Sequence, residues 1–132
     1  MSFRALIVDD SPAMRGFVRR VLDASGLDLG AVFEAADGVE ALDLLAGEWV
    51  DVILTDINMP RMDGETLVAR LAHSPAYAAV PVIVISTDST AVRREHLLAL
   101  GVRGYLTKPF SPEMLREEVE KVMEAVCPLN KL

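Results

Sequence analysis

The first apolar run, Ala5-Leu6-Ile7-Val8, decides the fold together with the two carboxylates that end it, Asp9-Asp10. Three more apolar runs end in reactive side chains: Val52-Ile53-Leu54 before Thr55-Asp56, Val82-Ile83-Val84-Ile85 before Ser86-Thr87, and Gly104-Tyr105-Leu106-Thr107 before Lys108-Pro109. Runs without polar alternation are typical of strands that are buried on both faces. If these strands are parallel, their carboxyl ends meet at one edge of the sheet, where open α/β sheets bind ligands.

Segments with helical periodicity separate these runs. The first helix is expected to begin near Pro12, with Ser11 as its cap, and to end at Gly26. A short strand is expected over residues 31–35 and the third strand over residues 51–56, and further helices should follow Gly38, Gly64, Thr90 and Ser111. This strict alternation predicts a parallel sheet with right-handed crossovers and helices on both faces, a three-layer α/β architecture.

The bulk composition narrows the class of protein. A chain of 132 residues suits one domain, so we expect a single domain over residues 1–132. The net charge of −7 argues against nucleic acid as a partner, because phosphate binding needs basic patches. Cys127 is the only cysteine, and no apolar run approaches the ~20 residues of a membrane span. These features are typical of a cytoplasmic protein with no membrane association.

The acidic residues at the strand ends predict a metal site. Asp9, Asp10 and Asp56 would lie close together, and like charges a few ångströms apart resist simultaneous ionisation. Mg²⁺ relieves this repulsion and binds one or two carboxylates together with waters. Asp9-Asp10 alone is more typical of a solvated loop. A metal site is favoured only because polar residues follow the other strands at equivalent positions.

The same residues could carry phosphoryl chemistry. A carboxylate can act as a nucleophile toward phosphorus, and Asp56 is the best candidate because Asp9 and Asp10 suit the metal. Lys108 would supply positive charge and the hydroxyl of Ser86 or Thr87 a hydrogen bond. Taken singly, Lys108 could be a surface lysine, and the hydroxyls could belong to a turn or a helix cap.

The chain resembles the receiver domain of two-component response regulators over essentially its whole length. The matching motifs are Val8-Asp9-Asp10-Ser11, Asp56 with Met59-Pro60 and Asp63-Gly64, Ser86-Thr87, Gly104-Tyr105, and Lys108-Pro109-Phe110. This resemblance implies a flavodoxin-like, doubly wound sheet of five parallel strands in the order 2-1-3-4-5 with five helices. A chemotaxis receiver is itself a known example of that order, which here is inherited from the resemblance.

The resemblance also implies a role for each motif residue. Asp56 would accept the phosphoryl group from a histidine kinase, and Asp10, Asp56 and the backbone carbonyl of Asn58 would bind Mg²⁺ directly. Asp9 would act through a water. Lys108 would pair with a phosphoryl oxygen, and its bond to Pro109 is often cis in this family. Ser86 would move toward the phosphoryl group while Tyr105 swings inward, although Tyr105 could also be an ordinary strand aromatic.

Three positions modify this expectation. Asn58 is neutral, as in chemotaxis-type receivers. Thr87 stands where the family usually has alanine or glycine, and its bulk should crowd the path of attacking water. We therefore hypothesise slow autodephosphorylation. Asp88 is expected to influence water access as well, in a direction that the sequence does not predict.

The resemblance implies a signalling switch rather than a conventional enzyme, although it would catalyse its own phosphorylation. It would act on a separate output protein, in chemotaxis or a phosphorelay, and we expect a monomer. Its output face would be the fourth helix, fifth strand and fifth helix, with Arg93, Arg94, His96, Arg103, Tyr105 and Lys121. A basic band on the first helix, Arg15, Arg19 and Arg20, could dock the kinase or simply be solvated.

Several alternatives remain open at this point. The chain could be a receiver that binds partners without phosphorylation, or a receiver fragment of a larger regulator or hybrid kinase. A haloacid-dehalogenase-like phosphatase would need an acid two positions after its nucleophile, where this chain has Asn58. A carrier of flavin mononucleotide is disfavoured because Asp9-Asp10 would repel the phosphate.

Overall fold

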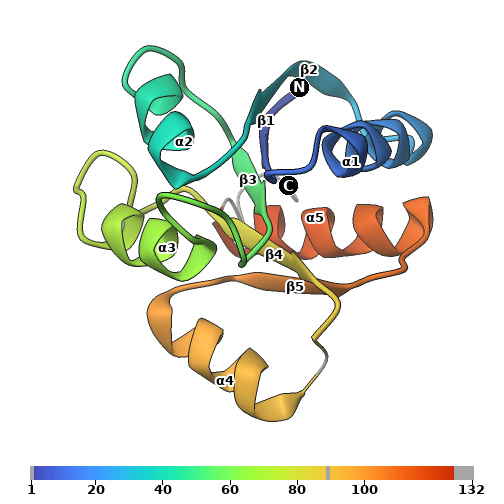
Figure 1. The fold of residues 1–132 in the computed structure, drawn as a ribbon. Coiled ribbons are helices and arrows are strands. Elements are labelled where there is room, and N and C mark those ends of the chain that lie inside the picture. Colours follow the sequence, from blue (N-terminus) through green and yellow to red (C-terminus); the bar gives the residue numbers. More distant parts are fainter. Residues whose placement is uncertain (1, 89, 127–132) are drawn as a thin grey trace.

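The computed structural model describes residues 2–88 and 90–126, in which strands and helices alternate strictly (Figure 1). The strands are β1 (Phe3–Val8), β2 (Leu29–Ala35), β3 (Val52–Thr55), β4 (Val82–Ser86) and β5 (Gly104–Thr107). The helices are α1 (Pro12–Ala24), α2 (Gly38–Leu45), α3 (Gly64–Ala72), α4 (Ala91–Leu100) and α5 (Pro112–Val126). The expected elements are therefore confirmed. β2 begins two residues earlier than expected, and β3 is one residue shorter at each end.

The sheet has the order β2-β1-β3-β4-β5, and every pair of neighbouring strands is parallel. This confirms the flavodoxin-like 2-1-3-4-5 arrangement. Val8, the last residue of β1, lies opposite Thr55, the last residue of β3, and Ser86 lies opposite Thr107. The strands thus end level with one another, and the residues that follow them lie along one edge.

Two hydrophobic clusters cover the two faces of the sheet. Leu6 and Val8 of β1 belong to the cluster beneath α2, α3 and α4, whereas Ala5 and Ile7 belong to the cluster beneath α1 and α5. Figure 1 shows α1 and α5 on one side of the sheet and the other three helices on the opposite side. Burial on both faces explains why these strands are apolar at every position.

The helix ends explain how the chain leaves and enters the sheet. All five helices begin at a side-chain cap. The cap residues each accept a backbone N–H three residues ahead, and they are Ser11, Asp37, Asp63, Thr90 and Ser111. Gly101 ends α4 in a left-handed conformation, with φ 111°, which glycine adopts without steric cost. None of the helices in the described residues is both long and apolar enough to span a membrane.

Candidate functional site

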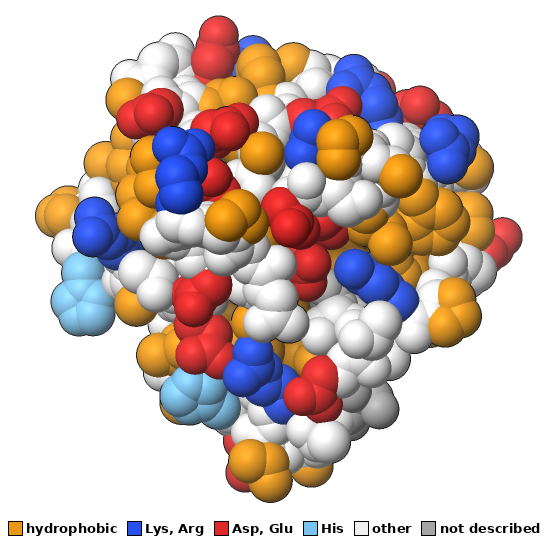
Figure 2. All heavy atoms as spheres, in the orientation of Figure 1, with side chains coloured by type: hydrophobic (Ala, Val, Ile, Leu, Met, Phe, Trp, Pro, Cys, Tyr) orange, Lys and Arg blue, Asp and Glu red, His pale blue; other side chains and the backbone are white. Residues whose placement is uncertain are grey.

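Three carboxylates meet at the carboxyl edge of the sheet. Asp9 and Asp10 follow β1, Asp56 follows β3, and one oxygen of each lies within 4.8 Å of the others. Figure 2 shows acidic side chains gathered at the centre of this face, with a basic side chain beside them. A set of clustered carboxylate oxygens fits a hard divalent cation, which would also offset their mutual repulsion. The structure thus brings together the expected metal-binding side chains.

Asp9 is the most buried of the three, with 5% of its surface exposed. Its Oδ1 accepts a hydrogen bond from the Ser11 N–H at 2.9 Å, and Lys108 Nζ lies 3.9 Å from Oδ2. Burial raises the pKa of Asp9, and the negative charges of Asp56 and Asp10 add to this effect. The Ser11 N–H and Lys108 oppose it. Ionisation of Asp9 in the folded protein therefore costs free energy, and a bound cation would reduce this cost.

Asp56 is held by its backbone and by one of its two carboxylate oxygens. Its N–H donates to the Val8 carbonyl at 2.9 Å, and Thr55 Oγ1 donates to the Asp56 carbonyl at 2.8 Å. The Ile57 N–H donates to Asp56 Oδ1 at 2.7 Å. No hydrogen bond from the part of the chain that the structure describes uses Oδ2. That oxygen is consequently available as a nucleophile.

Gly64 lets the loop after Asp56 return close to the strand end. Its N–H donates to the Ile57 carbonyl at 2.7 Å. A Cβ at this position would overlap the Asp56 carbonyl oxygen and would lie 2.9 Å from Ile57 Cα. Because backbone atoms cannot yield as a flexible side chain can, only glycine allows α3 to begin so near to Asp56.

Ser86 and Lys108 complete this edge. Ser86 is buried at the end of β4, and its Oγ accepts the Asp88 N–H at 3.1 Å. Within the described residues its own hydroxyl proton has no acceptor, so the hydroxyl can still donate. The Lys108 N–H donates to the Ser86 carbonyl at 2.8 Å, which ties the ends of β4 and β5 together. The Lys108–Pro109 peptide bond is cis, as the resemblance implied.

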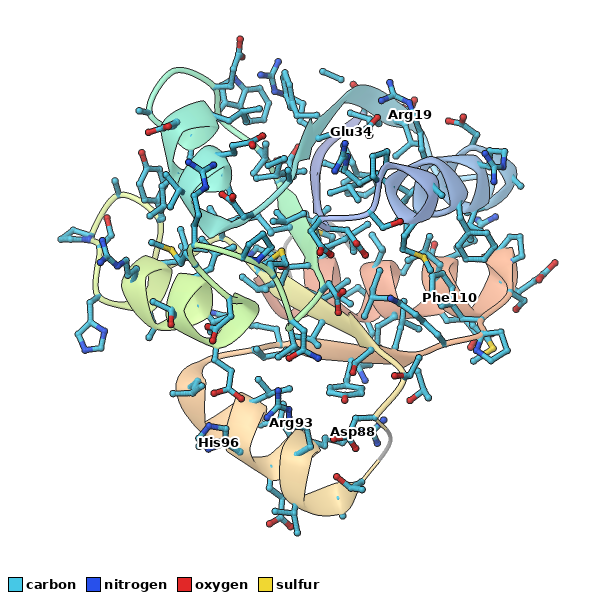
Figure 3. The ribbon with its side chains drawn as sticks, in the orientation of Figure 1. Arg19, Glu34, Asp88, Arg93, His96 and Phe110 are labelled. Carbon is cyan, nitrogen blue, oxygen red and sulfur yellow. The ribbon has the colours of Figure 1, made fainter. Side chains whose placement is uncertain are left out.

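The residues around Tyr105 link this edge to α4. Tyr105 is 7% exposed, its hydroxyl donates to the Asp88 carbonyl, and the Arg94 guanidinium lies 5.1 Å from its ring centre. Figure 3 labels Asp88 in the loop before α4. Its Oδ1 accepts the Thr90 N–H at 2.9 Å, which lowers the pKa of Asp88. Tyr105 thus occupies a buried position, and the exposed Thr87 and Asp88 lie between Ser86 and the start of α4.

The face of α4, β5 and α5 carries a hollow of about 440 Å³. Its lining includes Arg94, Arg103, Tyr105 and Lys121, four of the six residues expected there. The other two turn toward α3. Arg93 lies 2.8 Å and His96 3.4 Å from the Glu65 carboxylate. They fasten α4 to its neighbour and do not line the hollow.

Two arginine contacts around the site could not readily be predicted from the sequence. Arg15 donates to the Asp9 carbonyl at 2.6 Å, although its band on the first helix suggested a docking or solvated surface. Arg61, which has φ 62°, donates to Asp37 Oδ2 at 2.7 Å and holds the loop after β3 against α2. Asp37 followed by Glu40 three residues later is a helix-start pattern that could have indicated the cap, but not its arginine partner.

A parallel 2-1-3-4-5 sheet with an acidic cluster and a lysine at its carboxyl edge defines a class of signalling domain. Residues 5–120 match the response regulator receiver domain family, and the chain belongs to this family of phosphorylation-activated switches, which are not conventional enzymes.

Within the family, chemotaxis regulators are among the most similar proteins. A CheY homolog from Campylobacter jejuni is 40% identical over 121 residues, which cover 91% of this chain and 92% of that protein. The structure of the chemotaxis response regulator CheY4 of Vibrio cholerae has a TM-score of 0.82 at 34% identity, over 92% of this chain and 99% of that one. The sensor histidine kinase TmoS of Ectopseudomonas mendocina is 38% identical over 120 residues, 91% of this chain but only 12% of the kinase.

Proposed function

We propose that this chain accepts a phosphoryl group from a histidine kinase onto Asp56, in the presence of Mg²⁺, and thereby changes its affinity for a separate output protein. The observation that carries the proposal is the convergence of three carboxylates within 4.8 Å, with Lys108 beside them. Four strands that are far apart in the sequence contribute to this one edge.

The free Oδ2 of Asp56 would attack the phosphorus of the donor. A bond from this oxygen to phosphorus forms as the bond to the leaving group breaks, and Asp56 becomes an acyl phosphate. Lys108 Nζ and the Ser86 hydroxyl would contact the phosphoryl oxygens and stabilise their charge. When bound by Asp10, Asp56, the Asn58 carbonyl and, through water, Asp9, Mg²⁺ would supply further positive charge.

Ser86 and Tyr105 are the proposed switch residues. The Ser86 hydroxyl lies at the end of β4, and the Asp88 carbonyl that Tyr105 contacts is two residues further along the same loop. A movement of Ser86 toward the phosphoryl group would therefore displace the contact that holds Tyr105. Phosphorylation would bias an equilibrium that exists already. Asn58, Thr87 and Asp88 would modulate the lifetime of the phosphoryl group through the access of water.

The hollow on the face of α4, β5 and α5 is the proposed output surface. Its lining contains three basic side chains and one acidic side chain, Glu118, and the buried Tyr105 in this lining contacts the loop that follows Ser86. The similarity to chemotaxis regulators along most of both chains favours a monomeric, cytoplasmic regulator of chemotaxis. The TmoS match supports a second candidate, a receiver that works in a phosphorelay within or beside a hybrid kinase.

Intact mass after incubation with acetyl phosphate and MgCl₂ tests the proposal. We expect one phosphoryl adduct on the wild type and none on Asp56→Asn, and a chelator should abolish the adduct. Asp51→Asn is the matched control, because Asp51 lies at the opposite end of β3 and binds the Arg4 N–H.

Absence of the adduct from folded wild-type protein, with the cognate kinase as donor as well, would contradict the proposal. That result would favour a receiver that binds partners without phosphorylation. An adduct that persists in Asp56→Asn would assign the chemistry to another residue.

A further inference from the structure

We propose that Arg15 is a positioning residue for the metal site, which it serves by fixing the peptide that joins Asp9 to Asp10. This inference rests on the proposed function. Arg15 Nη1 donates to the Asp9 carbonyl at 2.6 Å, and Arg15 Nε donates to Glu34 Oε1 at 3.0 Å. One guanidinium therefore connects the end of β1 to β2.

The orientation of Asp10 depends on its backbone, because no other described residue restrains its side chain. Within the residues that the structure describes, the Asp10 carboxylate has no hydrogen bond or ion pair, and Asp10 is exposed. Asp9, by contrast, is restrained by two hydrogen bonds, since its N–H donates to the Ala35 carbonyl at 3.0 Å and its carboxylate accepts the Ser11 N–H. The direction in which Asp10 leaves the strand is thus set by the orientation of the peptide before it, and Arg15 holds the oxygen of that peptide.

The position and burial of Arg15 are unusual for an arginine on a helix surface. Arg15 lies in the first turn of α1, where the helix dipole favours acidic side chains over cations, and this turn contains no acidic residue. Its side chain is only 17% exposed, compared with 45% for Arg19 one turn later. Glu34 balances the charge of both arginines, and Figure 3 shows Glu34 of β2 beside Arg19 of α1. The contact that distinguishes Arg15 from Arg19 is the bond to the Asp9 carbonyl.

The chain thereby offers a matched control. Arg15→Ala and Arg19→Ala each remove one positive charge and one bond to Glu34, but only Arg15→Ala frees the Asp9 carbonyl. If charge alone mattered, losing a cation near an acidic site would tighten the binding of Mg²⁺ in both variants. A positioning role predicts the opposite sign for Arg15→Ala, because a ligand that is no longer held in place binds metal more weakly.

The experiment is an NMR titration of each variant with MgCl₂ at constant ionic strength, following the amide signals of Asp10 and Asp56. We expect Arg15→Ala to raise the Mg²⁺ dissociation constant about ten-fold, the range seen when outer-shell partners of metal ligands are removed. Arg19→Ala should leave it unchanged or slightly lower. Before any Mg²⁺ is added, the amide nitrogen of Asp10 should shift in Arg15→Ala alone. Saturating MgCl₂ should restore its phosphorylation by acetyl phosphate.

The outcomes separate this inference from the proposed function. Wild-type protein that binds Mg²⁺ and forms the adduct, alongside an Arg15→Ala variant of equal or higher Mg²⁺ affinity, would overturn the inference and leave the function standing. Wild-type protein that does neither would overturn both. Should Arg15→Ala not fold, Arg15→Lys replaces it, with Arg19→Lys as control. A lysine lacks the rigid fork that reaches both acceptors, so weaker Mg²⁺ binding is expected for Arg15→Lys only.

Discussion

At the scale of single residues, the site depends on which atoms are already engaged. Asp56 Oδ1 accepts the Ile57 N–H, whereas no hydrogen bond from the described residues uses Oδ2, the proposed nucleophile. Ser86 Oγ accepts the Asp88 N–H, whereas its proton has no acceptor among the described residues. Each of these two side chains is thus oriented through one hydrogen bond, which leaves a second group for the proposed chemistry. Thr87, by contrast, is exposed and adjoins this edge, so its size can be changed without disturbing the core.

Thr87→Ala should speed the loss of the phosphoryl group, because a smaller side chain opens the path of attacking water to Asp56. We expect a roughly two- to ten-fold faster rate, equivalent to at most about 1.4 kcal/mol of activation free energy. The decay of the adduct by intact mass, after removal of the donor, measures this rate. Thr87→Ser is the control, since it retains the hydroxyl and removes only the methyl group. A rate that is unchanged or slower in Thr87→Ala would refute steric crowding as the cause.

At the scale of elements, ion pairs fasten the loops and helices around the site. Glu65 of α3 contacts Arg93 and His96 of α4, so the helix that forms part of the proposed output face is attached to α3. Asp37 caps α2 and binds Arg61 of the loop after β3. This loop also carries Asn58, whose carbonyl is a proposed metal ligand. The ion pair between Asp37 and Arg61 therefore restrains the site through the backbone of this loop.

The Asp37 attachment predicts a pH dependence of stability. Hydrogen bonding to the Glu40 N–H, followed by the bond to Arg61, lowers the pKa of Asp37 below its usual value. The unfolded chain then binds the proton more readily than the folded one, so the stabilisation is present above pH about 4 and is lost as the pH falls through the folded-state pKa. Asp37→Asn keeps an acceptor for the cap but removes the charge, and it should lower Tm at neutral pH.

Thermal unfolding from neutral to acidic pH checks this expectation. The difference in Tm between wild type and Asp37→Asn should shrink as the pH falls below about 4, because the unfolded chain binds the proton first and the folded protein binds it only below its lowered pKa. Asp63→Asn is the control, because Asp63 caps α3 through the Thr66 N–H and the described residues contain no ion pair to it. If both variants showed the same pH dependence, the charge of Asp37 would have no special part in stability.

At the scale of the whole molecule, the binding of a cation to the folded edge should stabilise the entire domain. The carboxylates converge only when β1 and β3 are paired, so the unfolded chain has no such site. A ligand that binds only the folded state adds RT ln(1 + [L]/Kd) to the free energy of unfolding. MgCl₂ at ten times its Kd should contribute about 1.4 kcal/mol and raise Tm by roughly 5 °C.

Thermal unfolding with MgCl₂, compared with NaCl at equal ionic strength, measures this gain. The comparison matters because a chain with a net charge of −7 gains some stability from screening alone. Asp10→Asn should lose most of the Mg²⁺-specific gain, and Asp51→Asn, altered at the opposite end of β3, should keep it. An equal gain in both variants would place the bound cation elsewhere on the molecule.

The sequence by itself determined the alternating elements, the parallel sheet and the gathering of Asp9, Asp10, Asp56, Ser86 and Lys108. The physical reason is that these features depend on local patterns. Continuous apolar runs indicate strands buried on both faces, and parallel strands bring the residues that follow them to one edge. The strand order came from the resemblance, and the pairing of the strands confirmed it.

Only the tertiary structure decided which partners the long side chains contact. Arg15 contacts the Asp9 carbonyl, Arg61 contacts Asp37, and Arg93 contacts Glu65 and does not line the hollow on the face of α4, β5 and α5. An arginine can reach many acceptors from one backbone position, and its choice depends on where elements far apart in the sequence pack. Arg15 and Arg19 lie one turn apart on the same helix, yet only one of them meets the end of β1.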